Sequence, residues 1–190
     1  MSITKTNPTQ FALPLRILHW LMAACLIAML FIGVSMVASL GDYHALLTIH
    51  RPLGVLILLL ALLRLATRLS TRLPDFPPAM PRQERFVAKA SEGLLYALFL
   101  ALPLVGWAMQ SAGHYPIVMF GAVHLPPILP ARPELYAMLR ETHTILAYLL
   151  FLAFLAHMSA ILFHTAILRD GLLNRMVPWS VPAAADKSRT

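Results

Sequence analysis

The sequence predicts an all-α integral membrane protein, a four-helix bundle with its N- and C-termini in the cytoplasm, and three observations support this fold class. First, 59% of the 190 residues are hydrophobic and only 12% are charged, which is about half the charged fraction of a typical soluble domain. Second, four apolar stretches each reach the ~20 residues that cross a bilayer as a helix. Third, lysine and arginine are distributed unequally between the two ends of these stretches.

The four stretches define the predicted helices, which cover residues 13–40, 44–69, 86–112 and 136–168. None of them carries the polar stripe that a helix of a soluble bundle needs. The proline-rich segment 74–81 excludes a helix between the second and third stretches, and we expect the loop 113–133 to lie against the membrane surface. The chain is thus predicted to comprise an N-terminal cytoplasmic segment 1–12, a transmembrane domain 13–178 and a disordered tail 179–190.

The positive charges predict how the bundle is oriented. Twelve of the 15 lysines and arginines fall on the side of the termini, and the opposite side holds only Arg51, Arg132 and Arg140. Positive residues accumulate in the cytoplasmic segments of membrane proteins, so we expect both termini in the cytoplasm. The same rule accounts for the formal net charge of +7, and we expect membrane lipid rather than nucleic acid as the surrounding partner.

Four histidines lie inside the predicted helices at two depths. His19 is near the cytoplasmic end of the first helix, and His50 is near the outer end of the second. His143 and His157 are fourteen residues apart in the last helix, so they share one helix face and are separated by a rise of ~21 Å. An ionisable group at membrane depth is costly and indicates a functional site, and imidazole is a standard axial ligand of haem iron.

Depth therefore pairs His50 with His143 and His19 with His157, and each pair can ligate one haem iron from both faces. A single buried histidine is more often a hydrogen-bonded core residue than a ligand, but two depth-matched pairs favour a protein with two haems. The only cysteine is Cys25, so the covalent attachment of a c-type haem through Cys-x-x-Cys-His is excluded.

Further residues are candidates for cofactor contacts. Gly54 lies one turn after His50, where the missing side chain would let a porphyrin approach. Three arginines within a turn of a predicted ligand can either contact a haem propionate or extend their charge to the headgroups: Arg16, Arg51 and Arg140.

His164 lies on the same face of the last helix as His157, seven residues further along. We expect it on the cytoplasmic side, where it can hydrogen-bond a quinone or relay protons. The basic segment around Arg68, Arg82 and Arg85 is expected nearby. The alternative is an interfacial histidine without a specific role.

Several runs of residues resemble the bacterial cytochrome b561 family, and the resemblance covers about residues 10–178. Arg64 and Arg68 belong to the similar pattern of the second helix. The runs themselves are RILHW at 16–20, IHRPLG at 49–54, ALPLVG at 101–106, the loop 115–121, ETH at 141–143 and LLNRMVP at 172–178.

The resemblance implies a multi-pass cytochrome of the bacterial inner membrane with two haems b on the four histidines. The best-understood family members look like superoxide oxidases, which implies electron transfer from periplasmic superoxide to ubiquinone. The sequence lacks the strongly positive outer funnel expected of them, because its three outer arginines are matched by Asp42, Glu134 and Glu141. An electron-transfer subunit that docks to a dehydrogenase or a periplasmic redox protein is the alternative, and a non-redox membrane scaffold is a third.

Overall fold

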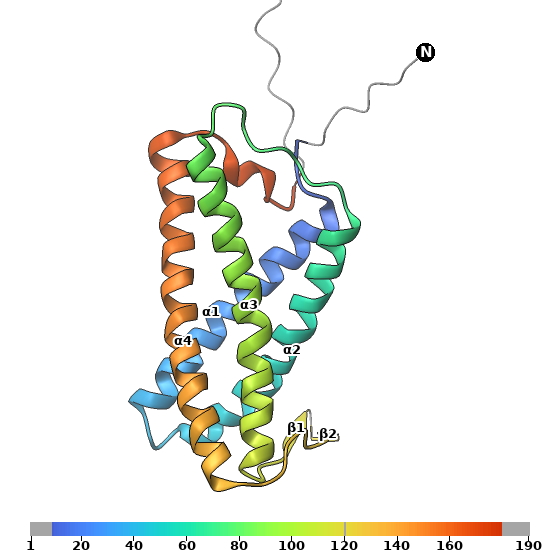
Figure 1. Ribbon diagram of the computed structural model, residues 1–190, viewed down its shortest axis with the longest axis vertical. Helices are drawn as coiled ribbons and strands as arrows, with labels where there is room; N and C mark the ends of the chain where they lie inside the picture. Colours follow the sequence, from blue (N-terminus) through green and yellow to red (C-terminus); the bar gives the residue numbers. More distant parts are fainter. Residues whose placement is uncertain (1–8, 120, 180–190) are drawn as a thin grey trace, which may run out of the picture.

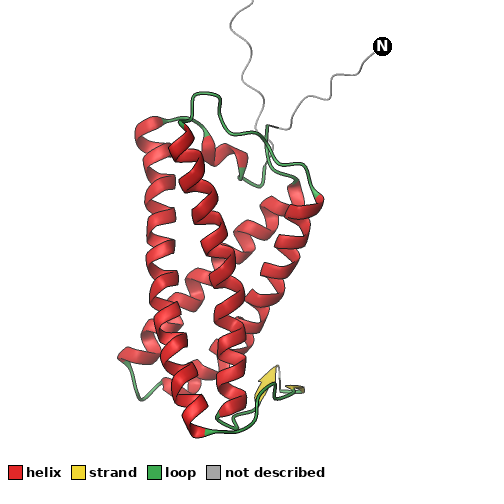
Figure 2. Ribbon diagram, in the orientation of Figure 1, coloured by secondary structure: helices red, strands yellow, loops and turns green. Residues whose placement is uncertain are grey.

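The computed structural model describes residues 9–119 and 121–179, and most of them form four long helices (Figure 1, Figure 2). Helix α1 packs against α2, α2 against α3, and α3 against α4, and Figure 1 shows α1 inclined across the other helices. The helices are α1 (Leu13–Ala38), α2 (Tyr43–Ser70), α3 (Arg82–Ala112) and α4 (Pro133–Leu162).

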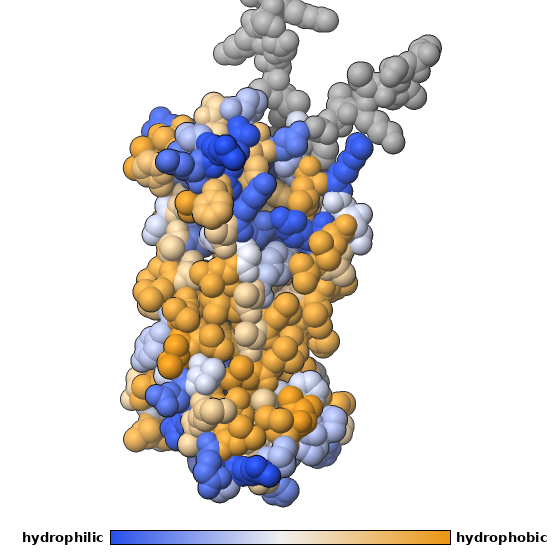
Figure 3. All heavy atoms as spheres, viewed as in Figure 1, coloured by the Kyte–Doolittle hydropathy of each residue, from blue (hydrophilic) through white to orange (hydrophobic). Residues whose placement is uncertain are grey.

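All four helices are long and apolar enough to cross a membrane. Large apolar side chains such as Phe31, Val37 and Leu152 point outward and are 61–81% exposed. Figure 3 shows these surfaces as a hydrophobic band between two more hydrophilic ends. Such a surface is favourable in lipid and unfavourable in water, so the predicted all-α membrane four-helix bundle is confirmed.

A small apolar core fills the middle of the bundle. It consists of Met22, Leu26, Ala61, Leu98, Phe99, Leu102 and Leu150, all of them buried. Leu150 lies seven residues from both His143 and His157 in α4. The core therefore separates two levels of the bundle that each contain histidines.

The two ends of the bundle differ in structure. The termini end carries the connection 71–81, the π-helical turn η1 (Phe163–Leu168) and the short 3-10 helix η2 (Leu172–Arg175). The hairpin end carries the turn 39–42 and the antiparallel strands β1 (Ile117–Met119) and β2 (Val123–Leu125), in which Val118 pairs with His124.

The predicted helix boundaries agree with the structure to within a few residues, with two informative differences. The last helix begins at Pro133, three residues earlier than expected, because proline is well suited to the first turn of a helix. The hairpin β1–β2 was not predicted. Residues 1–8 and 180–190, which include Lys5, Lys187, Arg189 and most of the expected tail, lie outside the described residues.

Candidate functional site

The four helix histidines form two facing pairs. His19 of α1 and His157 of α4 have ring centres 6.4 Å apart at an interplanar angle of 65°. His50 of α2 and His143 of α4 have ring centres 6.2 Å apart at 68°. The pairs lie at the termini end and the hairpin end respectively, and α4 contributes one ring to each. The pairing expected from depth is therefore the pairing that the fold produces.

The spacing of each pair fits one metal ion held between two imidazoles. Metal–imidazole bonds are about 2 Å long, so two rings that coordinate the same ion from opposite sides have centres roughly 6 Å apart. No group of three or more His, Cys, Asp or Glu side chains converges in residues 9–119 and 121–179. The pairs thus suit a metal that receives only two ligands from the protein, which is the requirement of bis-histidine haem.

The surroundings of the pair at the hairpin end support this fit. Nδ1 of His50 and Nδ1 of His143 are buried without a hydrogen-bond partner in the described part of the chain. The ring of His143 lies so close to α3 that a Cβ at Gly106 would be 3.2 Å from its Cε1. The close approach of α3 at Gly106 therefore restricts the position of the His143 ring on one side.

Arg64 and Tyr96 surround the pair at the termini end. Arg64 is only 8% exposed although it carries a charge. Its Nη2 lies 3.3 Å from Nδ1 of His19, and its Nη1 donates a 2.8 Å hydrogen bond to the Tyr96 hydroxyl. The sequence predicted Arg64 only as one of the twelve positive residues on the side of the termini, and this role was missed. Its position inside an apolar helix was the available signal.

Two of the three arginines that were candidates for propionate contacts have other hydrogen-bond partners in the structure. Arg16 is buried, and its Nη1 donates to the carbonyls of Val177 at 2.9 Å and Trp179 at 3.0 Å. Nη1 of Arg51 donates to the Pro116 carbonyl at 3.3 Å. The carbonyl contacts account for the burial of Arg16 without a propionate, whereas Arg51 remains adjacent to the pair at the hairpin end.

Two other candidates lie in ordinary surroundings. Arg140 is exposed and lines a shallow surface groove on the outside of α4. A Cβ at Gly54 would meet only Met29 Cε, at an ordinary contact distance of 3.7 Å. Gly54 was predicted to let a porphyrin approach, whereas the close approach to a histidine ring in the structure is at Gly106.

His164 forms a separate pair with an acid at the termini end. Its Nδ1 lies 2.5 Å from Oδ2 of Asp170, and Oδ1 of Asp170 accepts a hydrogen bond from the Leu172 amide. Burial alone would raise the pKa of the Asp170 carboxyl, but the hydrogen bonds from His164 and Leu172 outweigh it and lower that pKa. The η1 turn that holds His164 is π-helical, a rare geometry that is frequent at functional sites.

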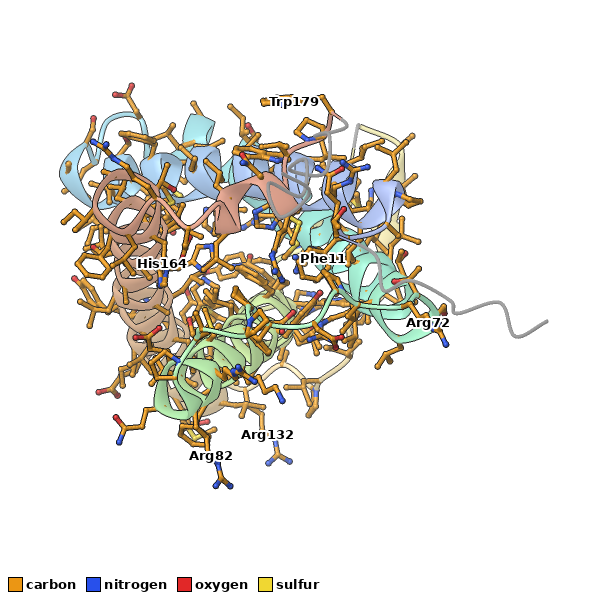
Figure 4. All side chains as sticks on the ribbon, turned by 90° about the horizontal axis from the view of Figure 1, so that it is seen from above. Phe11, Arg72, Arg82, Arg132, His164 and Trp179 are labelled. Carbon is orange, nitrogen blue, oxygen red and sulfur yellow. The ribbon has the colours of Figure 1, made fainter. Side chains whose placement is uncertain are left out.

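The basic residues expected near His164 have separate contacts. Arg68 forms an ion pair with Glu92, and Arg85 donates to the carbonyls of Pro77, Pro78 and Met80. In Figure 4, Arg82 extends outward from the start of α3, away from His164. His164 therefore has an acidic partner, and Arg68 and Arg85 have partners of their own.

Comparison with known proteins identifies the family. The model of the prokaryotic cytochrome b561 family matches residues 10–179. The chain belongs to this family. Cytochrome b561 homolog 2 of Escherichia coli strain K12 is 27% identical over 93% of this chain and 95% of its own length. Cytochrome b561 homolog 1 of the same strain is 26% identical over 85% and 93%.

A third relative carries a more specific name. The probable superoxide oxidase CybB of Yersinia pestis is 31% identical over 68% of this chain and 73% of its own length. Membership of the prokaryotic cytochrome b561 family implies haem b binding and membrane electron transfer. Together with the four spanning helices, it makes the chain a multi-pass bacterial membrane cytochrome.

Proposed function

We propose that this cytochrome b561 binds two haems b, one between His50 and His143 and one between His19 and His157, and moves electrons between them across the bilayer. The observation that carries the proposal is the two pairs of facing imidazoles, with ring centres 6.2 Å apart in one pair and 6.4 Å in the other. Their place at opposite levels of one bundle, with α4 common to both, supports a path along the helix axes. The arginine-rich termini end supports a cytoplasmic location for the termini and insertion in the inner membrane.

The chain's own residues hold and insulate this path. A bound haem b supplies a reversible one-electron change at its iron. The four histidine rings would hold the two haem irons, and the close approach of α3 at Gly106 would restrict the position of the His143 ring. The apolar core around Leu150 excludes water from the region between the two levels.

At the hairpin end, the proposed electron donor is periplasmic superoxide. The name of the Yersinia pestis relative, probable superoxide oxidase, supports this choice. Arg51 supports it as well, because it adjoins His50 and is partly buried. A cation beside the predicted haem ligand attracts an anionic donor to the haem that would receive its electron.

At the termini end, the proposed electron acceptor is ubiquinone, and His164 is its proposed proton donor. Reduction of a quinone to the quinol takes up protons as well as electrons. Because Asp170 engages Nδ1 of His164, the other ring nitrogen, Nε2, is left to face a quinone carbonyl oxygen and donate a proton. The pair is the histidine–carboxylate arrangement that fixes an imidazole for proton transfer.

Stopped-flow mixing of the oxidised cytochrome with superoxide tests the proposed activity. Haem reduction at close to diffusion-limited rates, followed by reoxidation with a soluble ubiquinone analogue, is the expected result. Absence of haem reduction by superoxide, in protein that dithionite reduces fully, would remove superoxide as the substrate.

A second candidate is an electron-transfer subunit that takes electrons from a redox protein. The two Escherichia coli relatives are named as cytochrome b561 homologs, without a substrate. The hairpin end also has a fixed surface, because Trp107 Nε1 donates to the Pro126 carbonyl and Ile128 N donates to the Ser111 hydroxyl. Reduction of the haems by a co-purified partner, combined with no reaction with superoxide, would favour this function.

A further inference from the structure

Four side chains of α2 and α3 form two polar contacts at the termini end, one turn apart. At the inner contact, Nη1 of Arg64 donates to the Tyr96 hydroxyl at 2.8 Å. At the outer contact, Nε and Nη2 of Arg68 donate to the two carboxylate oxygens of Glu92 at 2.6 Å and 2.5 Å. We call these four residues the α2–α3 ladder. It leads from the end of the bundle to His19, whose Nδ1 lies 3.3 Å from Arg64.

The ladder carries one positive charge that the protein does not neutralise locally. The outer ion pair balances itself, and the tyrosine is neutral, so the remaining charge is that of Arg64. Nε of Arg64 is buried and has no hydrogen-bond partner within residues 9–119 and 121–179. The guanidinium carbon also lies 5.2 Å from the centre of the Tyr96 ring, an arrangement that favours a cation over the ring face. Burying an arginine in this way is costly, which indicates that the charge has a use.

The hydrogen-bond chemistry of His19 defines what that use can be. In the structure, Nδ1 of His19 can accept from Arg64 only while the ring carries its proton on Nε2. If Nε2 coordinates iron, the proton is on Nδ1, and Arg64 can no longer donate to it. Arg64 then acts on the site through its charge, and its bond to Tyr96 is what keeps that charge in place.

We infer that Arg64, held by Tyr96, is a positioning residue that raises the reduction potential of the site formed by His19 and His157. The inference rests on the proposed haem ligation. Adding an electron to the site lowers its net charge by one, and a neighbouring cation stabilises the reduced state relative to the oxidised state. The second site, formed by His50 and His143, lies about 21 Å away along α4 and is affected much less.

Potentiometric titration of the purified cytochrome tests this inference. Arg64→Gln is expected to lower the equilibrium constant for reduction of one haem by about tenfold or more, which is a downward shift of ~59 mV for each factor of ten. The other haem is the internal control, and the His19→Ala protein identifies which titration step belongs to which site. Arg64→Lys retains the charge and is expected to restore most of the potential.

A matched control separates the charge of Arg64 from the structural effect of the ladder. The double variant Arg68→Gln/Glu92→Gln removes the outer contact without changing the net charge, and it is expected to leave both potentials in place. If Arg64→Gln does not retain both haems, Tyr96→Phe supplies the test, because it removes only the acceptor that holds Arg64. A downward shift of one step in Tyr96→Phe supports the inference.

Two results would overturn the inference. The first is an unchanged potential at both steps in whichever of the two variants retains its haems. The second is an equal shift of both steps, which indicates a general change of the bundle. Neither result bears on the proposed function, which is tested separately on the unmodified protein by its haem content and by its reaction with superoxide. The two failures are therefore distinguishable.

Discussion

Nη1 of Arg16 donates a 2.9 Å hydrogen bond to the carbonyl of Val177, and this contact joins the first turn of α1 to the last described residues of the chain. The same nitrogen donates to Trp179, and Trp20 Nε1 donates to the Met176 carbonyl at 2.9 Å. The segment after η2 is therefore fastened across the termini end. These contacts explain why Arg16, one turn before the predicted haem ligand His19, is buried.

We predict that Arg16→Met lowers stability and leaves both haems in place. Hydrogen bonds from charged groups contribute roughly 1.5–3 kcal/mol each, so the loss is expected to be about 2 kcal/mol or more. Thermal unfolding in detergent measures this loss, and Arg72→Met is the control because Arg72 is exposed. Loss of a haem at unchanged stability would instead assign Arg16 to a propionate.

We predict that His19→Ala or His157→Ala removes one haem and retains the other. Each site depends on its own two rings, and the apolar core separates the two levels. The haem-to-protein ratio should fall by half, with one redox step remaining. His44→Ala alters an exposed histidine and should retain both haems. Equal loss of both haems from every single variant, in protein that is still folded, would argue against two separate sites.

We predict that Gly106→Val perturbs the site at the hairpin end. A Cβ at Gly106 would lie 3.2 Å from Cε1 of His143, and a branched side chain would displace the ring further. The absorption spectrum and occupancy of one haem should change while those of the other are maintained. Gly93→Val is the matched control, because a Cβ at Gly93 meets nothing within 4 Å. Identical spectra for the two variants would contradict the assignment of Gly106.

We predict that His164→Ala retains both haems but slows ubiquinone reduction about 100-fold, the usual minimum loss when a general acid is removed. Asp170→Asn should have a smaller effect, because it changes only the partner that orients the ring. Reoxidation of the pre-reduced protein by a ubiquinone analogue provides the rate. An unchanged rate in His164→Ala would exclude this histidine and direct attention to the hairpin end.

The contribution of the His164–Asp170 pair to the stability of the fold is predicted to depend on pH. The pKa of Asp170 is lowered from its ordinary value of 3.8, so the pair stabilises the fold at pH values above 3.8. That contribution is lost as the pH falls through the lower, folded-state pKa. Unfolding measured against pH should show a difference between the unmodified protein and Asp170→Asn that disappears in strong acid. A difference that persists there would contradict the ion pair.

Much of the fold could be predicted from the sequence because the bilayer imposes simple rules. Helix length and apolar composition located all four helices. The fourteen-residue step from His143 to His157 depends only on helix periodicity, so the facing pairs could be expected before the structure was known.

The parts that sequence did not predict depend on contacts between distant segments. Arg64 was counted only among the positive residues of the termini side, because its bond to Tyr96 depends on how α2 packs against α3. Arg16 was interpreted as contacting either a propionate or the headgroups, because the return of the C-terminal segment to α1 leaves no local pattern. Gly106 was not singled out, because its approach to His143 depends on how α3 packs against α4.

The haem content of the purified, unmodified protein tests the central claim most directly. A reduced-minus-oxidised spectrum combined with a haem-to-protein ratio, measured on protein from haem-replete cells, gives both the type and the number of haems. The histidine pairs predict two haems b per chain that titrate in two one-electron steps. One haem per chain, or a colourless protein, would contradict the account.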